Sequence, residues 1–405
     1  MRSRVTRTYA LVPALLAAPL ATVKTDVQSG VSGHVFVDAN GNGRRDAGER
    51  GVPSVAVSNQ DEVVRTGADG AYTLSAIGPT GIVFVSVPDG FRAHGAFYRQ
   101  LARTGNAAES VDFPLAPQPA RESLTFVHAS DTHIAGPVVA RTRRLKALVD
   151  SIKPAFVLIT GDLVRDALRV GEAEATGYYE LFATETAAFG APLYTVPGNH
   201  ENFGIETALS KVSPDHPLFG RAMYRHYRGP DYYSFTTGGV HFVGLNSVDI
   251  DDTRYYGHVD SLQLAWLARD LAVLPPAMPV VTFNHIPFYS SMEIVNGLSE
   301  RPPAPSVITV NGKSQFRHTV ANAADVLAAI KGHPFPLALA GHVHARERLR
   351  FEGVPTRFDQ AAAIVSPSPA SIGILRSGIT VYRITRGQVD EGRFVPLGLD
   401  SSGRR

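Results

Sequence analysis

Five short apolar runs, each ending in polar side chains, recur along the chain from residue 123 onward. In order, they read LTFVHASD, AFVLITGD, PLYTVPGN, PVVTFNH and PLALAGHVH. Runs of this length that are rich in branched and aromatic residues are typical of buried β-strands. Between them, apolar residues recur at helical spacing in four segments, 140–152, 174–189, 260–273 and 319–331. This alternation predicts an α/β sheet with helices packed on its faces.

A second sheet is predicted from two further segments. Residues 229–250 have the pattern of two strands joined by Gly238 and Gly239, and strand-like runs continue from about 346 to 397. Two sheets packed face to face with helices outside would form a four-layer α/β/β/α sandwich over residues 123–397. The proline-rich segment 286–317 reads as a long unstructured loop, which favours a functional lid or rim.

The chain before residue 117 has a different pattern. Residues 30–116 hold short runs of β-branched and aromatic residues, interrupted by glycine, asparagine, aspartate and proline. They predict a small all-β sandwich domain. Residues 117–122 read as a linker, because prolines there and just before disfavour helix and continued strand pairing.

A candidate calcium loop lies within this small domain. Residues 38–49, DANGNGRRDAGE, fit the spacing of oxygen ligands in an EF-hand loop, although the flanking residues are strand-like. Together with the later TGADGAYTLS, the segment resembles the B-type β-sandwich repeats of bacterial surface proteins, which implies calcium. The alternative is an asparagine-rich turn without metal. The candidate ligands are Asp38, Asn40, Asn42, Asp46 and Glu49.

The first residues predict export. Arg2, Arg4 and Arg7 precede an apolar run that ends among alanines near residue 21. This is the pattern of a secretory signal peptide over residues 1–21, and the run is short for a membrane span. A disordered start and a membrane anchor are the alternatives. The signal peptide predicts a secreted or periplasmic protein with no transmembrane segment in the mature chain.

Composition narrows the chemistry. The 405 residues include no cysteine, so disulfides, thiolate ligands and cysteine nucleophiles are excluded. A metal would have to be held by histidine, aspartate, glutamate or asparagine. The formal net charge of +2 lacks the basic excess typical of nucleic-acid binders, and we expect no nucleic acid as a structural partner.

The polar ends of the five apolar runs carry the candidate chemistry. In open α/β sheets, ligands bind where the carboxyl ends of the strands open into loops. A single aspartate there is usually a helix cap, and a single histidine is usually structural. Eight such residues at one edge are enough for two metal ions. They are Asp131, His133, Asp162, Asn199, His200, His285, His342 and His344.

The order D-x-H, G-D, G-N-H, H and G-H-x-H resembles the calcineurin-like metallophosphoesterase family, over about residues 123–385. The resemblance implies two divalent transition metals, and histidine with carboxylate suits Mn, Fe or Zn. It implies one metal at Asp131, His133 and His344, a second at Asn199, His285 and His342, and Asp162 between them. It also implies that a metal-bridging hydroxide attacks the phosphorus while His200 acts beside the metals.

Two details of this motif need the fold to decide them. In an extended strand, His342 and His344 would point to the same side and reach one metal only, so the chain must turn there, and Gly341 makes a turn plausible. Many family members place an aspartate three residues after the bridging aspartate, where this chain has Arg165. Either Asp166 takes its role in orienting His200, or His200 lacks that partner.

Candidate substrate contacts are Arg165 and, in a segment rich in polar aromatic residues, Tyr256 and His258. The leading expectation is a secreted dinuclear-metal phosphoesterase that hydrolyses a phosphomonoester or a phosphodiester, with a small phosphate ester as its partner. The alternatives are a nucleotide or cyclic-nucleotide hydrolase or pyrophosphatase. A further alternative is a cell-surface glycan-binding protein with an inert phosphoesterase domain.

Overall fold

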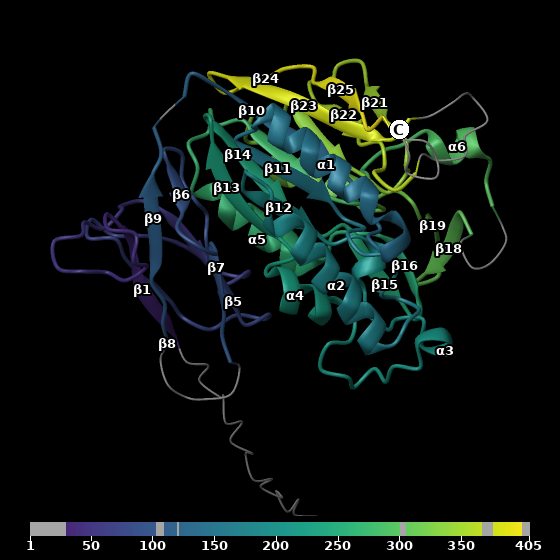
Figure 1. Cartoon of the computed structure of the whole chain (residues 1–405), viewed down its shortest axis with the longest axis horizontal. Helices are drawn as coiled ribbons and strands as arrows, with labels where there is room; N and C mark the ends of the chain where they lie inside the picture. Colours follow the sequence, from purple (N-terminus) through teal and green to yellow (C-terminus); the bar gives the residue numbers. More distant parts are fainter. Residues whose placement is uncertain (1–29, 103–108, 120, 300–304, 367–375, 399–405) are drawn as a thin grey trace, which may run out of the picture.

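The computed structural model describes residues 30–102, 109–119, 121–299, 305–366 and 376–398 (Figure 1). The predicted signal peptide, residues 1–21, lies outside these ranges. Among the helices that are described, none is long and apolar enough to cross a bilayer.

The N-terminal region is all β, as predicted, and forms two sheets. One has the strand order β4-β1-β9-β6, with β8 also paired to β1, and the other has the order β3-β2-β5-β7. The first sheet contains β1 (Val31–Val37), β4 (Ala71–Leu74), β6 (Phe91–Ala93), β8 (Glu109–Ser110) and β9 (Phe113–Pro117). The second contains β2 (Ala56–Ser58), β3 (Val63–Arg65), β5 (Ile82–Val85) and β7 (Tyr98–Gln100).

The third sheet begins directly after the predicted linker. Its order is β12-β11-β10-β23-β24, with β25 also paired to β23. The strands β10, β11 and β12 are parallel, whereas β23 is antiparallel to β10. The bounds are β10 (Ser123–Ala129), β11 (Phe156–Thr160), β12 (Leu193–Val196), β23 (Gly378–Thr385), β24 (Gln388–Val389) and β25 (Arg393–Pro396).

The fourth sheet has the order β13-β14-β17-β20-β22-β21. As predicted, Gly238 and Gly239 form the turn between its first two strands. The bounds are β13 (Tyr233–Thr237), β14 (Val240–Gly244), β17 (Val280–Phe283), β20 (Leu337–Ala340), β21 (Glu347–Arg350) and β22 (Arg357–Gln360). A separate hairpin pairs β15 (Val248–Asp251) with β16 (Arg254–Gly257).

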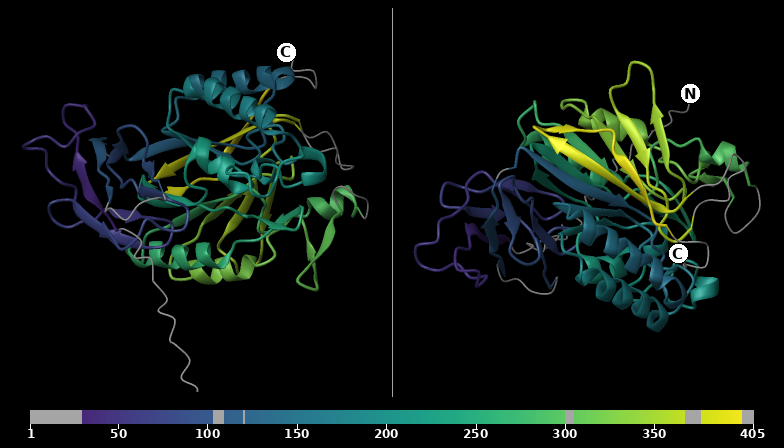
Figure 2. Two further views of the ribbon diagram at one scale, coloured as in Figure 1. Left: turned by 90° about the horizontal axis from the view of Figure 1, so that it is seen from below. Right: turned by 45° about the horizontal axis from the view of Figure 1, so that its top comes forward.

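Helices cover the outer faces of these two sheets, which confirms the predicted four-layer sandwich (Figure 2). One layer contains α1 (Val139–Ile152), α2 (Glu172–Ala187) and α4 (Arg221–Arg228), and the other contains α5 (Ser261–Ala272) and α7 (Ala323–Ile330). Short elements complete the described chain: η1 (Gly136–Val138), η2 (Asn199–Glu201), α3 (Thr207–Ser210) and α6 (Met292–Asn296).

Strand alternation divides the apolar residues between two cores. Along β11, Phe156 and Leu158 face the other sheet, while Val157 and Ile159 face α1 and α2. Successive side chains on a strand point to opposite faces, so a strand buried on both sides must be apolar at every position. This explains the unbroken apolar runs that punctuate the sequence.

The small β-sandwich docks on β13 and α5, at the end of the molecule away from α6 (Figure 1). Gln60 is fully buried in this interface, where its Nε2 donates to the Tyr232 carbonyl at 2.9 Å and to Asp231 Oδ1 at 3.2 Å. Trp266 Nε1 donates to Ser58 Oγ at 3.1 Å. Apolar residues of both parts form one continuous core, so the sandwich packs directly against the α/β domain.

The prediction that residues 286–317 form one unstructured loop was wrong for much of this segment. It contains the helix α6 and a hairpin of β18 (Val307–Val310) and β19 (Lys313–Phe316). Asn311 and Gly312 have φ angles of 50° and 75° at the tip. An Asn-Gly pair is a strong signal for a tight hairpin turn, and the prolines nearby masked it.

Candidate dinuclear metal centre

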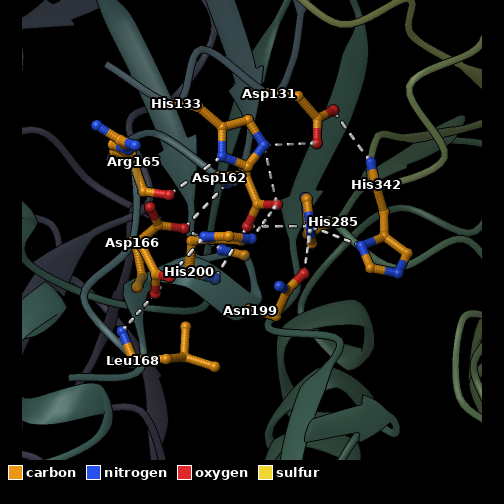
Figure 3. Close-up of polar contacts among 12 residues, drawn as sticks. Asp131, His133, Asp162, Arg165, Asp166, Leu168, Asn199, His200, His285 and His342 are labelled. Atoms are coloured by element: carbon orange, nitrogen blue, oxygen red, sulfur yellow. Dashed lines mark hydrogen bonds and ion pairs between the residues drawn. The ribbon is translucent and has the colours of Figure 1, made fainter. Parts of the chain in front are cut away.

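The candidate residues labelled in Figure 3 converge in space, and His344 lies with Asp131, His133 and Asp162 in the same cluster. Each follows a strand at its carboxyl end. Strand β10 precedes Asp131 and His133, and β11 precedes Asp162. Strand β12 precedes Asn199 and His200, β17 precedes His285, and β20 precedes His342 and His344. Parallel strands end at the same edge of a sheet, and the two sheets pack so that their edges meet. The expected clustering of these side chains is therefore present.

A first group contains Asp131, His133, Asp162 and His344, whose potential ligand atoms all lie within 4.8 Å of one another. The Nε2 atoms of His133 and His344 are 3.2 Å apart. Oδ2 of Asp162 is 3.4 Å from His133 Nε2, and Oδ1 of Asp131 is 3.3 Å from His344 Nε2.

A second group contains Asp162, His285 and His342. Nε2 of His285 lies 3.1 Å from His342 Nδ1, 3.2 Å from Asp162 Oδ1 and 3.1 Å from Asn199 Oδ1. Asp162 thus presents Oδ2 to the first group and Oδ1 to the second. A carboxylate shared in this way is what a pair of metal ions requires.

The local chemistry fits cations at both groups. Oδ1 of Asp131 is buried and has no hydrogen-bond partner among the described residues, whereas Oδ2 accepts from the His342 backbone N–H at 3.1 Å. Metal–ligand bonds of about 2.0–2.2 Å place neighbouring ligand atoms about 3.0–3.5 Å apart. The closest separations between ligand atoms in each group lie in that range, and imidazole and carboxylate are the ligands that Zn, Mn and Fe accept.

The backbone turns sharply at five of these residues. Asp131, His133, Asp162, His342 and His344 have φ angles of 54°, 39°, 47°, 71° and 53°. Residues other than glycine rarely adopt this left-handed region, at a cost of order 1–3 kcal/mol each. The turn predicted for His342 and His344 is present, and it directs these two side chains to different groups.

Gly341 serves close packing. A Cβ at Gly341 would lie 1.8 Å from Ser130 Oγ and 2.8 Å from Asp131 Oδ2, and its φ is not in the left-handed region. A Cβ at Gly198 would lie 2.1 Å from Asp162 Oδ1. The turn itself is made by the histidines, and glycine lets the loop that follows β20 approach the loop that follows β10.

Glu201 supports the site and was missed by the sequence analysis. It is buried, and its carboxylate accepts from four backbone N–H groups, which belong to Asp162, Leu163, Val164 and Gly198, at 2.6–3.0 Å. Burial and the nearby Asp162 raise the pKa of Glu201 to about 8, and the N–H donors oppose that shift. The only sequence signal is an acidic residue directly after G-N-H.

Burial and neighbouring charges shift the pKa values of the buried histidines. Burial disfavours a charged His285, but the Asp162 carboxylate beside it raises the pKa of His285 to about 9. Burial and the neighbouring His200 lower the pKa of His133 to about 4. A metal ion binds only an unprotonated imidazole nitrogen, so metal binding at His285 would release its proton.

His200 lies beside the two groups, as expected from the resemblance. Its Nδ1 is 3.8 Å from Asp166 Oδ1, too far for a hydrogen bond, and has no hydrogen-bond partner in the described parts of the chain. Asp166 accepts instead from the Leu168 N–H at 3.0 Å and from Arg169 Nη1 at 2.9 Å. Asp166 therefore faces His200 without holding it.

The predicted substrate contacts do not reach the centre. The Arg165 side chain is exposed and points away from the cluster (Figure 3), while its carbonyl lies 3.4 Å from His133 Nδ1. Tyr256 packs on Ile308 and Val310, and His258 bonds Asp249 at 3.0 Å. Because neighbours on a strand face opposite sides, Tyr255 rather than Tyr256 faces the cavity.

A cavity of about 540 Å³ opens over the metal groups. Its walls include Tyr255, Met292, Glu293, Ser306 and His318, in addition to His200 and five candidate ligands, which are His133, Asp162, Asn199, His342 and His344. His318 was missed by the sequence analysis, because it stands alone in a segment without a motif.

The candidate calcium loop is closed by its own hydrogen bonds. Asp38 accepts from the N–H groups of Gly41, Asn42 and Gly43 and lies 2.5 Å from His94 Nδ1. The side-chain amides of Asn40 and Asn42 donate to Asp46, and Glu49 accepts from backbone N–H groups. These contacts fit an asparagine-rich turn, and calcium binding there stays a prediction.

The fold and the site define a class: a four-layer α/β/β/α protein with a candidate dinuclear metal centre at its strand ends. Residues 124–346 match the calcineurin-like phosphoesterase family model, and residues 39–118 match the model described as the N terminal of calcineurin-like phosphoesterase. The chain belongs to the calcineurin-like phosphoesterase family and is a metal-dependent phosphoric ester hydrolase. The resemblance of the small domain to B-type repeats stays a prediction.

Several known proteins are similar to this chain. A cAMP/cGMP dual specificity phosphodiesterase of Mycobacterium tuberculosis is 23% identical over 272 residues, which cover 62% of this chain and 72% of that protein. A Rhodococcus erythropolis protein named "Probable cyclic nucleotide phosphodiesterase" is 25% identical over 268 residues, with the same coverage. A solved dimetal phosphatase from Danio rerio is 15% identical with a TM-score of 0.45, and the match covers 67% of this chain and 96% of that one.

Proposed function

We propose that this enzyme hydrolyses a phosphomonoester or a phosphodiester at two metal ions. Asp131, His133 and His344 would hold one ion, and Asn199, His285 and His342 would hold the other. The observation that carries the proposal is the position of Asp162, whose two carboxylate oxygens are divided between the groups. When bound, such ions polarise the phosphoryl oxygens and make water nucleophilic near neutral pH.

The protein's own groups position the reaction. The carboxylate of Glu201 ties the loop of Asp162 to the loop of Asn199, which holds ligands from two strands in fixed relation. His200 lines the cavity, and its backbone N–H donates to Asp162 Oδ1 at 3.0 Å. In this position its imidazole would lie beside the reacting ester and could donate a proton to the leaving oxygen.

The walls of the cavity favour a substrate with one phosphoryl group. Beyond the candidate ligands and His200, the only charged side chain that the described lining contains is Glu293. A second phosphoryl group would meet that carboxylate, and the described lining offers it no lysine or arginine. This argues against the pyrophosphatase alternative and leaves simple esters and cyclic nucleotides.

Cyclic-nucleotide hydrolysis is the second candidate function. The two relatives named above carry that activity in their names. A cyclic nucleotide has one phosphoryl group, and a cavity of about 540 Å³ falls within the usual range for small-molecule sites. The alternative of an inert, glycan-binding protein has less support, because all seven candidate ligands are present.

Export is part of the proposal. The arginines and the apolar run of residues 1–21 support a signal peptide, which would place the enzyme outside the cytoplasm. We expect a bacterial host that expresses the full chain to export a protein shortened by removal of the signal peptide.

The test is an ester panel assayed with Mn²⁺ supplied, including a phosphomonoester, a linear phosphodiester and 3′,5′-cyclic AMP. We expect Asp162→Ala to lower kcat at least about 1,000-fold, because both ions would lose a ligand. Asp150→Ala, on the exposed face of α1, is the matched control and should keep full activity. Unchanged hydrolysis by the Asp162 variant would contradict the proposed function.

A further inference from the structure

We propose that His318 is a substrate-contacting hydrogen-bond donor of this enzyme, and that the candidate metal ligand His342 fixes its tautomer. The inference deepens the proposed function and rests on it. None of the sequence motifs includes His318.

The contact between the two imidazoles is direct. Nδ1 of His318 lies 2.6 Å from Nε2 of His342, and the rings stack with centroids 4.9 Å apart at 26°. Two neighbouring elements hold His318 in this position. It follows the hairpin of β18 and β19, and the Ala321 N–H just beyond donates to the Gly257 carbonyl at 2.8 Å.

The direction of the hydrogen bond follows from the chemistry of His342. Its Nδ1 faces His285 Nε2 at 3.1 Å within the second metal group, so Nδ1 is the nitrogen that would bind the ion. A neutral imidazole that binds metal through one nitrogen carries its proton on the other. Nε2 of His342 therefore donates, and Nδ1 of His318 must accept.

An imidazole that accepts at Nδ1 carries a proton at Nε2. A doubly protonated His318 is excluded in this arrangement, because two N–H groups would face each other across 2.6 Å. His318 lines the cavity, and within the described ranges no protein group accepts from its Nε2. The free N–H is then available to a phosphoryl or leaving-group oxygen.

Two substitutions separate the two roles of His318. In His318→Asn, the Oδ1 atom can still accept from His342, but the Nε2–H donor is lost. In His318→Phe, both are lost, while a planar ring of similar shape remains against His342. His216→Asn is the control, because His216 pairs with Glu172 away from the cavity.

Three readouts apply to the metal-loaded, full-length protein: kcat/KM, the Kd of inorganic phosphate, and the affinity for Mn²⁺ from chelator competition. We expect His318→Asn to lower kcat/KM about 100-fold, as for other lost oxyanion donors, and to weaken phosphate binding. Its Mn²⁺ affinity should stay within about three-fold of the parent. His318→Phe should also weaken one Mn²⁺ site about 10- to 100-fold.

Full kcat/KM and unchanged phosphate binding in His318→Asn would overturn the substrate contact. Unchanged Mn²⁺ affinity in His318→Phe would overturn the link to His342. Failure of the proposed function looks different, since the parent protein itself would then hydrolyse no ester. Phosphate and Mn²⁺ binding would still test His318 in that case.

Discussion

At the scale of single residues, a buried histidine outside the metal groups ties stability to pH. His128 in β10 is fully buried, its Nε2 lies 3.0 Å from Thr160 Oγ1, and its Nδ1 has no hydrogen-bond partner among the described atoms. Burial lowers the pKa of His128 to about 4. Burial therefore favours the neutral ring over the charged ring in the folded protein.

The sign follows from where protons bind. Between pH 6.5 and 4, an unfolded chain protonates this histidine while the folded chain does not, so acid favours unfolding. From pH 7 to 5, His128 should reduce the free energy of unfolding by about 2 kcal/mol. Urea denaturation of the parent and of His128→Leu at both pH values measures this. The variant should lose that part of the pH dependence.

His226→Leu is the control, since His226 is exposed. It should follow the parent at both pH values. Parallel losses of stability in the parent and His128→Leu would contradict the assignment of this effect to His128.

The sequence alone predicts the candidate ligands but not the residues that support them or line the cavity. Asp131, Asp162 and the histidine pairs stand in short motifs at strand ends, and the strands carry them to one edge. His318 and Glu201 act through contacts with residues far along the chain, which no local pattern records. Which of Tyr255 and Tyr256 faces the cavity depends on the register of the strand, because a shift of one residue moves every side chain to the opposite face.

At the scale of elements, the ends of β10 and β20 must pass within contact distance for the site to exist. Gly341 allows this approach, because a side chain there would overlap Ser130 and Asp131. Each strand is otherwise an ordinary apolar segment. The site therefore depends on the packing of two loops against each other as much as on the ligands.

Gly341→Ala should therefore damage the metal centre. We expect a loss of about 1–3 kcal/mol in unfolding free energy from overpacking, and weaker Mn²⁺ binding because Asp131 is displaced. Thermal unfolding and metal analysis measure both effects. Gly136→Ala, where no atom lies within 4 Å of the added Cβ, should leave both unchanged. Normal metal content in Gly341→Ala would show that the loops can separate without cost.

The helices predicted from the sequence are confirmed where apolar residues recur at helical spacing over a long segment. The four predicted helices appear as α1, α2, α5 and α7, because each has an apolar face against a sheet. Residues 286–317 were mispredicted, because prolines in one part of the segment obscured the hairpin signal of Asn311 and Gly312 in another.

At the scale of the whole molecule, Gln60 links the small sandwich to the α/β domain. Its amide donates to a buried carbonyl and to the buried Asp231, so Gln60→Ala would leave both acceptors short of a donor. We expect a loss of about 1–3 kcal/mol in unfolding free energy with kcat/KM unchanged. Chemical denaturation and the ester assay measure these quantities.

Gln118→Ala, in the short connection between the two parts, is the control and should leave the unfolding free energy nearly unchanged. A large drop in turnover for Gln60→Ala would instead mean that the sandwich shapes the active site.

The shared apolar core also bears on modularity. Two family models divide the chain near residue 120, yet Ser58 and Trp266, on either side of that boundary, bond each other inside one hydrophobic interior. Cutting the polypeptide at the connection would expose apolar surface on both fragments. We therefore expect the two domains to be inherited together, and we expect neither to be exchanged separately in evolution or in engineered chimaeras.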